Sequence, residues 1–408
     1  MTRPIGFAAY LVVTAAYWAF MLTDGALRML VLLHFHGLGF SSVQLAYLFV
    51  LYEVAGMVTN LCAGWLAVRF GLTTTLYAGL GLQIVALLAL TQLDPSWSIA
   101  VSVAFVMCAQ GVSGIAKDLT KMSSKSAVKL LAPSEDSTLF QWVAVLTGSK
   151  NAIKGLGFFL GGALLAVFGF EGAVLGMACA LGFLLTLVVW RMPPGLPSGM
   201  KGAKFSAVFS TSEAVNWLSL ARVFLFSARD VWFVVGVPLY FYGVWSDGSD
   251  AGNKAAFFMI GSFMALWVIG YGIVQGSAPK ILARLPVQSA FALAMLLAFM
   301  PLILAIVLWL SSSAVTPLVV IGLFVFGFGF ALNSALHSFL ILSFSTDARV
   351  SMDVGFYYMA NAAGRLLGTL LSGVAYQAGG LELCLLIASL MLFLSAAVAR
   401  RLPQSGVA

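Results

Sequence analysis

Charged side chains are scarce in this sequence, in which only 9% of the 408 residues are Asp, Glu, Lys or Arg. Soluble domains contain about a quarter of such residues, whereas here 62% of the residues are hydrophobic and the mean hydropathy is +1.04. This composition excludes a soluble protein and predicts a polytopic membrane protein. Acidic residues are the rarer kind, 14 against 21 Lys and Arg, so the formal net charge is +7. Basic loops at a bilayer explain that excess, and no soluble basic segment is present, so we expect no nucleic-acid partner.

Cysteine is also rare, and its placement excludes two further kinds of site. The four cysteines lie far apart in apolar runs without a C-x-x-C pair, so neither a disulfide framework nor a thiolate metal site is indicated. They are Cys62, Cys108, Cys179 and Cys384. The sequence also lacks a nucleophile–base pair, a phosphate-cradling G-x-x-x-x-G-K-[ST] loop and an H-E-x-x-H motif. We therefore expect neither an enzyme nor an ATP-driven pump, with no metal and no cofactor.

Long apolar runs take the place of the missing charge. A helix needs about 20 residues to cross a hydrocarbon core of about 30 Å, and twelve runs are long enough. They cover approximately residues 7–36, 41–68, 72–93, 97–123, 138–168, 171–191, 214–243, 256–282, 287–311, 315–345, 351–378 and 381–400. Because lipid offers no partner to free backbone groups, each run must be helical. The sequence thus predicts an all-α fold of twelve transmembrane helices, the first of which is retained rather than cleaved.

The connections between these runs predict the orientation of the chain and its division. Basic residues gather in the connections on one side and acidic residues in those on the other, which places both termini in the cytoplasm. We expect a multi-pass monomer in the lipid bilayer of a bacterial inner membrane. A polar, Pro-rich linker at 193–213 separates a six-helix bundle at 1–192 from a second bundle at 214–408.

The two halves echo each other in sequence. A constant offset aligns Lys154 with Arg365 and Gly157 with Gly368, and the first and seventh spans carry Asp24 and Asp230 in their middles. Weak internal symmetry of this kind is expected of two-bundle secondary transporters, which bind substrate where the halves meet. The alternative is that glycine-rich helices resemble one another by chance.

Charge is distributed unevenly among the predicted spans. The third, sixth, ninth and twelfth spans have no Asp, Glu, Lys or Arg in their interiors, so they should be peripheral while the others surround a polar cavity. Basic residues outnumber acidic ones in that cavity. Unpaired buried cations are unfavourable, so we expect an anionic substrate to supply the missing partner. Arginine forks and lysine point charges suit a small ligand with more than one negative charge.

The candidate site residues fall into three sets. The basic residues expected to bind substrate are Arg28, Lys117, Lys150, Lys154, Arg229 and Arg365. The acidic residues that are candidates for coupling are Asp24, Glu53 and Asp230, and the secondary cavity residues are Lys121, Arg222, Asn333 and His337. A spacing of four places Lys117, Lys121, Lys125 and Lys129 on one helical face. The first two of these lysines should enter the cavity and the last two should form a cytoplasmic rim.

Several of these residues have a purely structural alternative. Asp24 with Arg28, at i and i+4, and Asp230 beside Arg229 form structural ion pairs in that reading. Glu53 is either a proton site, if burial raises its pKa, or a hydrogen-bonding residue between the first two helices. The sequence leaves these alternatives open.

The chain resembles the major facilitator superfamily by its six-plus-six layout. The family's loop between helices 2 and 3 reads G-x-x-x-D-[RK]-x-G-R-[RK], and this chain keeps Gly64, Arg69 and Gly71 but has Val68 in place of the acid. Five strings in both halves resemble one branch more closely, the organoarsenical efflux permeases of the ArsJ type. They are residues 23–36, 114–122, 146–154, 228–235 and 265–275.

The resemblance implies export of 1-arseno-3-phosphoglycerate and hence arsenate resistance. It also implies a functional link to glyceraldehyde-3-phosphate dehydrogenase, which forms this compound when arsenate replaces phosphate. Two alternatives remain: an organophosphate–phosphate antiporter, which also uses arginines on helices 1 and 7, and a non-transporting receptor or scaffold. The charged midplane argues against the last.

Overall fold

The computed structural model describes residues 5–131, 136–192, 209–282, 289–310, 315–345 and 350–403. Its helices are α1 (Ile5–Gly37), α2 (Ser42–Tyr47), α3 (Val50–Phe70), α4 (Leu72–Leu90), α5 (Ile99–Leu131), α6 (Asp136–Arg191), α7 (Glu213–Phe233), α8 (Gly236–Trp245), α9 (Asp250–Leu282), α10 (Ser289–Leu310), α11 (Thr316–Phe344) and α12 (Val350–Ala399). The described ranges contain no β-strand, so the predicted all-α fold is confirmed. The predicted linker lies largely outside them, and the division into two bundles stays a prediction.

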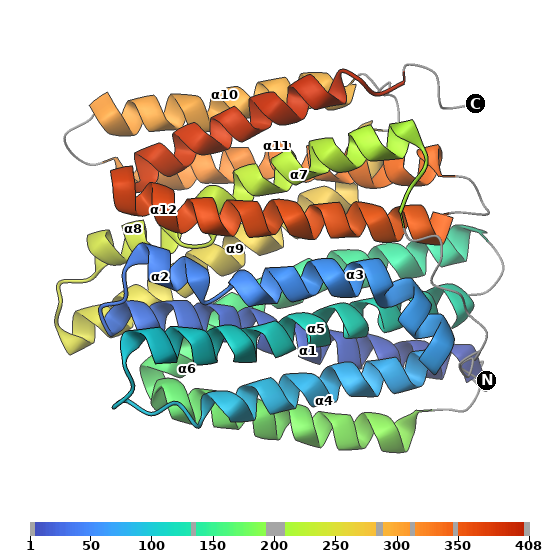
Figure 1. The fold of residues 1–408 in the computed structure, drawn as a ribbon, viewed down its shortest axis with the longest axis horizontal. Coiled ribbons are helices and arrows are strands. Elements are labelled where there is room, and N and C mark those ends of the chain that lie inside the picture. The colour runs from blue at the N-terminus through green and yellow to red at the C-terminus, as the bar shows by residue number, and fades with distance from the viewer. Residues whose placement is uncertain are drawn as a thin grey trace.

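Nine helices in the described residues are long and apolar enough to cross a membrane, by length and composition. Two of these are long enough for two crossings of about 20 residues each, because α6 has 56 residues and α12 has 50. Helical geometry is interrupted at Gly169 of α6 (φ 69°) and at Gly379 and Gly380 of α12, the latter with φ 63°. Positive φ favours glycine, which has no Cβ to clash with the backbone. Figure 1 shows α12 turning back at its break toward the end from which it came.

The predicted span 214–243 is interrupted where α7 ends and α8 begins. A break inside a membrane leaves backbone N–H groups that lipid cannot satisfy. Here the hydroxyl of Ser372, on α12, accepts hydrogen bonds from the N–H groups of Val235 (3.1 Å) and Gly236 (3.3 Å). The Ser372 hydroxyl therefore stabilises the break, and no pattern in the sequence indicates this contact.

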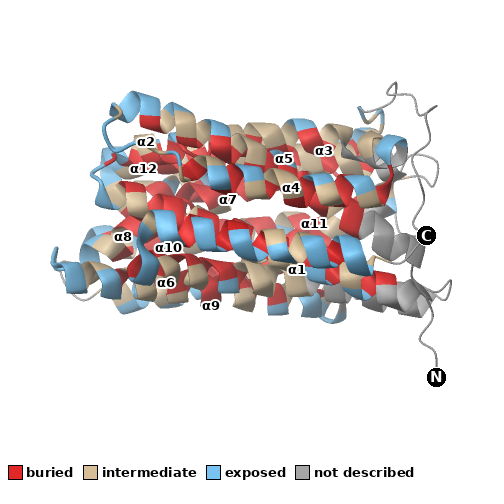
Figure 2. Ribbon diagram, turned by 90° about the horizontal axis from the view of Figure 1, so that it is seen from below, coloured by how far each residue is buried: buried red, intermediate tan, exposed pale blue. Residues whose placement is uncertain are grey.

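The helices lie side by side along the long axis of the molecule (Figure 1). The charge-free spans form its two edges: α4 and the second segment of α6 along one, α10 and the second segment of α12 along the other. Their outer faces carry exposed large side chains, such as Phe183 (75% exposed) and Trp309 (81%). In Figure 2 the buried residues lie mainly inside the bundle, and the exposed ones lie on its outer surface and at its ends. This arrangement agrees with the expectation that the charge-free spans are peripheral.

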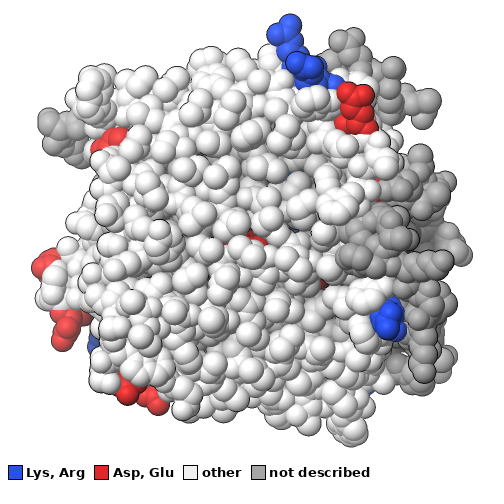
Figure 3. Space-filling view, in the orientation of Figure 1, with Lys and Arg blue, Asp and Glu red and all other residues white. Residues whose placement is uncertain are grey.

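Charged side chains on the face in Figure 3 lie mostly toward the two ends of the molecule, with a largely uncharged surface between them. At one end α1 and α7 begin and α3 and α5 end (right in Figure 1), and we call this the terminal end. The opposite end carries acids of the connecting loops, including Asp94 and Asp247. Hydrogen bonds from the backbone and side chain of Ser96 lower the pKa of Asp94, so this carboxylate keeps its charge. The termini themselves and the side chains of Lys125 and Lys129 lie outside the described residues.

Glycines allow two helix pairs to pack backbone to backbone beside the charged residues. A Cβ at Gly25 of α1 would lie 2.5 Å from the carbonyl oxygen of Lys154 and 3.3 Å from Cα of Gly157, both on α6. In the other half, a Cβ at Gly368 of α12 would lie 2.6 Å from the carbonyl oxygen of Ser227 on α7. The contacts α1–α6 and α7–α12 are thus equivalent, and they bring the aligned pair Lys154 and Arg365 to corresponding places.

Candidate functional site

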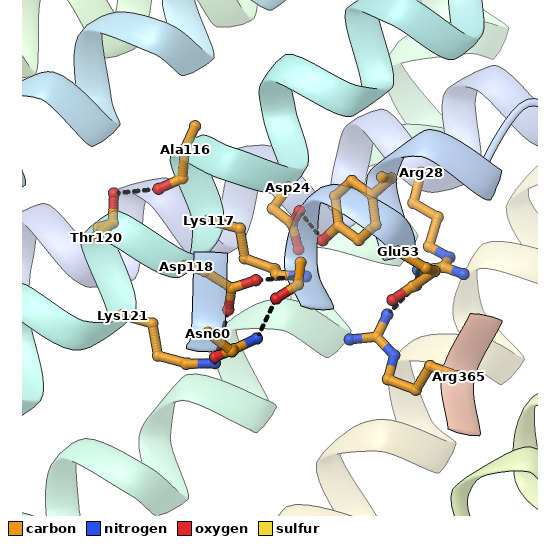
Figure 4. Close-up of polar contacts among 12 residues, drawn as sticks. Asp24, Arg28, Glu53, Asn60, Ala116, Lys117, Asp118, Thr120, Lys121 and Arg365 are labelled. Atoms are coloured by element: carbon orange, nitrogen blue, oxygen red, sulfur yellow. Dashed lines mark hydrogen bonds and ion pairs between the residues drawn. The ribbon is translucent and has the colours of Figure 1, made fainter. Parts of the chain in front are cut away.

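Glu53 lies at the centre of a buried ion-pair network that joins the N-terminal and C-terminal halves of the chain (Figure 4). Its Oε1 atom receives NH2 of Arg365 at 2.6 Å and NH1 of Arg28 at 3.3 Å. Arg28 comes from α1, Glu53 from α3 and Arg365 from α12. Since Glu53 is fully buried, the two arginines supply the positive charge that an isolated carboxylate would lack there.

The C-terminal half extends this network through Asp230 on α7. One carboxylate oxygen of Asp230 is 2.5 Å from NH2 of Arg229, and the other is 3.4 Å from Nε of Arg365. Arg365 therefore contacts acids from both halves at once. The chain of contacts runs from Arg28 through Glu53, Arg365 and Asp230 to Arg229 without interruption.

The N-terminal half contains the counterpart of the Asp230–Arg365 contact. Lys154 of α6 lies 2.5 Å from Oδ2 of Asp24 on α1, and the hydroxyl of Tyr52 donates to the other oxygen of Asp24 at 2.5 Å. The Tyr52 ring also faces the ammonium of Lys117, 4.1 Å from the ring centroid. Cations over aromatic faces are stabilised most where water is excluded. We call the seven residues Asp24, Arg28, Glu53, Lys154, Arg229, Asp230 and Arg365 the central network.

A smaller cluster lies on α5 and α3, adjacent to the central network (Figure 4). Both Lys117 (3.3 Å) and Lys121 (2.6 Å) contact the buried carboxylate of Asp118. Lys121 also donates to Oδ1 of Asn60 at 2.6 Å, and the amide of Asn60 donates in turn to the carbonyl of Gly56 at 2.6 Å. One acid thus serves two lysines, which leaves this cluster net positive.

Burial separates the basic side chains of these clusters from the acidic ones. The cations Arg28, Lys121, Lys154, Arg229 and Arg365 each keep 12–16% of their side-chain surface accessible and Lys117 keeps 8%, whereas the four acids keep 0–2%. The accessible part of the site is therefore basic, and its carboxylates lie behind the cations. Such a surface attracts anions and offers donors to them.

Arg222 forms a separate group with neutral partners. Its Nε donates to Oδ1 of Asn361 (2.9 Å) and its NH1 donates to the carbonyl of Ser334 (3.1 Å). Asn333 and His337 flank Ser334 on α11, fully buried, and neither side chain has a hydrogen-bond partner among the described residues. Buried polar groups without partners are rare, so this group needs an explanation beyond packing.

The structure brings most of the sequence-derived candidates together, and their roles remain predictions. It does not pair Asp24 with Arg28 as the i, i+4 spacing suggested: Asp24 pairs with Lys154, and Arg28 pairs with Glu53. Lys150 lies one turn before Lys154 on α6. Sequence reasoning missed Tyr52, because an aromatic residue in a membrane span is lipid-facing or packing by default.

Comparisons with known proteins support the predicted fold. They do not test the resemblance to one branch of transporters. No protein-family model matches the chain, and no curated protein matches it. Solved structures do match over nearly the whole length. A proton-dependent oligopeptide transporter gives a TM-score of 0.71 at 14% identity, covering 97% of this chain and 98% of that one. A POT family transporter in complex with a thioalcohol-conjugated peptide gives 0.74 at 14% identity, covering 98% and 96%.

The xylose transporter XylE from E. coli, in an inward-open conformation, gives a TM-score of 0.71 at 12% identity and covers 98% of this chain and 97% of that one. At such identities the likeness shows the fold alone, so this chain has the fold of these major-facilitator-type transporters. The structures named are of transporters. None of them bears on the resemblance to organoarsenical permeases.

Proposed function

We propose that the protein is a secondary active membrane transporter that moves a small, multiply charged organic anion by alternating access. The observation that carries this proposal is the arrangement of charge. The basic side chains are more accessible than the fully buried acidic side chains, and they outnumber them. Six basic residues share the four carboxylates of the two ion-pair clusters. A structural network would gain stability from balanced charge, whereas a surplus suits a site whose last partner is the ligand.

The donors available to such a ligand come from both halves. Arg28, Lys154, Arg229 and Arg365 present accessible side chains, and NH2 of Arg28 is buried without a hydrogen-bond partner in the described structure. With Lys117 and Lys150 these residues form the proposed substrate site. An anion that contacts both halves can stabilise the closed state, which is what alternating access requires of its substrate.

The proposed topology has twelve spans, with α2 and α3 forming one span and α7 and α8 another. The breaks in α6 and α12 support it, since each divides a helix too long for one crossing into two. The proposed bundles are residues 1–192 and 214–408, joined by the linker 193–213. Both termini lie in the cytoplasm, and the protein is a monomer in the bacterial inner membrane.

Asp24, Glu53 and Asp230 are the proposed coupling residues. Each is buried and receives at least one cation that also faces the accessible side. When the substrate draws such a cation away, the carboxylate loses the positive charge that stabilises its ionised form, and proton binding then becomes more favourable. Oε2 of Glu53 is buried without a hydrogen-bond partner in the described residues, which supports Glu53 as the proton acceptor. Exchange for another anion is the alternative mode of coupling.

The proposed substrate is 1-arseno-3-phosphoglycerate, exported from the cell. This choice rests on the five sequence strings that resemble organoarsenical permeases, and a ligand with phosphate and arsenate groups suits a site of arginines and lysines. The second candidate is an organophosphate–phosphate antiporter. The uninterrupted chain of contacts from Arg28 on α1 to Arg229 on α7 favours it equally, because that class also uses arginines on these two helices.

One experiment separates the two candidates. The protein is expressed in an arsenate-sensitive bacterium with and without its glyceraldehyde-3-phosphate dehydrogenase, and growth in arsenate is measured. We expect tolerance only when both proteins are present. Tolerance without the dehydrogenase, or uptake of sugar phosphates by the cells, would overturn the arsenical assignment, and uptake would support the antiporter.

A matched variant links the result to the site. Arg365→Met should abolish tolerance, because Arg365 is the cation that contacts acids of both halves. Lys254→Met, at an exposed residue at the opposite end, should leave tolerance unchanged. Equal tolerance in both variants would show that the central network is not required for transport.

A further inference from the structure

Two basic side chains lie nearer the terminal end than the central network does. Arg222 precedes Arg229 on α7 by about two helical turns, and Lys121 contacts Asn60, about two turns beyond Glu53 on α3. Two turns correspond to about 10 Å along a helix. We call Lys121 and Arg222 the lower pair.

The two residues of the lower pair come from opposite halves of the chain. Each lies against one ring of a pair of adjacent tyrosines. Lys121 Nζ lies 5.1 Å from the ring centroid of Tyr358, and Arg222 Cζ lies 5.1 Å from that of Tyr357. The two tyrosines are neighbours on α12, with ring centroids 5.6 Å apart in an edge-to-face arrangement. Two positive charges therefore flank a tyrosine pair at the boundary between the halves.

The positive charge of Arg222 is not neutralised by a carboxylate at ion-pair distance in the described structure. Lys121 shares its carboxylate, Asp118, with Lys117. Arg222 bonds to a side-chain amide and a backbone carbonyl, and no carboxylate among the described residues lies within ion-pair distance of it. Neutral acceptors satisfy the N–H groups of a guanidinium but leave its charge uncompensated.

Polar side chains without hydrogen-bond partners in the described structure lie close in sequence to Ser334, the residue whose carbonyl Arg222 contacts. Both amide atoms of Asn333 and both ring nitrogens of His337 are fully buried and lack hydrogen bonds in the described structure. They flank Ser334, whose carbonyl accepts from Arg222. A protonated phosphate or arsenate group carries both hydroxyl donors and oxygen acceptors, so it matches this mixture of donors and acceptors, which a halide does not.

We propose that Lys121 and Arg222, with the tyrosine pair between them, form a second anion subsite at which the substrate is held between the terminal end and the central network. This inference rests on the proposed transport function and extends its site. The ligand class is the same, a small organic phosphate or arsenate. A separation of about 10 Å lets two anions occupy the subsites at once, but their repulsion makes the second bind more weakly.

Equilibrium binding of radiolabelled 3-phosphoglycerate to the purified, detergent-solubilised full-length protein tests the proposal. We expect two binding steps of unequal affinity. Lys121→Met should weaken the lower-affinity step at least tenfold and leave the tighter step within about twofold, whereas Lys121→Arg should retain both. Arg365→Met should remove the tighter step. Lys280→Met, at an exposed lysine of the terminal end, should change neither. Lys121→Met is preferred to Arg222→Met because the arginine is held by two buried hydrogen bonds, so its loss could impair folding.

The outcomes distinguish the subsite from the function itself. A single binding step that is lost in Arg365→Met and unchanged in Lys121→Met would overturn the subsite and leave the proposed function standing. Equal weakening of both steps by Lys121→Met would also overturn it. Lys121 would then act on both steps through the electrostatic field of the site and not through contact with one bound anion. Absence of any binding, together with absence of transport of this probe in vesicles, would overturn both proposals.

Discussion

Lys154→Met removes the cation from a buried carboxylate and leaves the charge of Asp24 unpaired. The ion pair is 2.5 Å long, and the side chains of Lys154 and Asp24 are 16% and 2% exposed. Removing one partner of a buried pair costs about 3–5 kcal/mol. The remaining hydrogen bond from Tyr52 and the partial exposure of Lys154 place the expected loss near the lower value, about 3 kcal/mol.

The double variant Asp24→Asn with Lys154→Met should recover most of that loss. It removes both charges and leaves an amide that can still accept from Tyr52, so the expected cost falls to about 1 kcal/mol. The difference of about 2 kcal/mol is the stability recovered when Asp24 no longer carries an unpaired buried charge. In a chain of this length 1 kcal/mol changes the melting temperature by about 1 °C, so the single variant should melt about 3 °C lower.

The buried thiol of Cys384 provides the assay. In a background in which the other three cysteines are alanine, a fluorogenic thiol reagent reports unfolding of the purified protein in detergent. Lys254→Met, at an exposed lysine, is the control and should not change the melting temperature. Equal melting temperatures for the single and double variants would refute the reasoning, because Asp24 would then gain nothing from Lys154.

Three further predictions use the same melting assay. Arg365→Met should cost less stability than the lysine variant, since each acid that it contacts keeps a second arginine, yet it should abolish transport; a larger loss of stability would contradict this. Gly25→Ala should lower the melting temperature by several degrees because its Cβ would meet backbone atoms, whereas Gly176→Ala, with open space around it, should not. Ser372→Ala should cost about 1–3 kcal/mol by leaving the N–H groups of the α7–α8 break unpaired. Ser262→Ala, whose hydroxyl bonds only to its own helix, should cost clearly less, and equal losses would mean that the break finds other partners.

The parts of the fold that followed from the sequence depend on the contrast between lipid and a polar interior. Apolar runs predict helices because lipid leaves the backbone no other choice. The absence of charge from every third span predicts which helices lie at the edges, because a charge facing lipid is costly. The alignment of Lys154 with Arg365 was visible for a similar reason: each lies beside glycines that allow close helix packing, and that pattern repeats in both halves.

The partners of the charged residues could not be read from the sequence. The i, i+4 spacing of Asp24 and Arg28 indicated a pair on one helix, but long side chains reach across helices, and contacts with other elements decide the pairing. Glu53 pairs with a residue 312 positions away, which no local pattern records. The hydroxyls of Tyr52 and Ser372 act on groups that only the tertiary structure brings near them.

The near symmetry of the two halves makes one difference between their described charge contacts informative. Lys154 contacts an acid of its own half only, whereas Arg365 contacts Asp230 in its own half and Glu53 in the other. Under the proposed alternating access, halves that rock about the centre of the bundle move least near this crossing contact, so it can persist in both states. The contact of Lys121 with Tyr358 also crosses the halves, but it lies about two turns nearer the terminal end and must separate when that end opens. Opening of the terminal end would therefore separate the two sides of the lower pair and admit or release its substrate anion, while the central crossing contact stays in place.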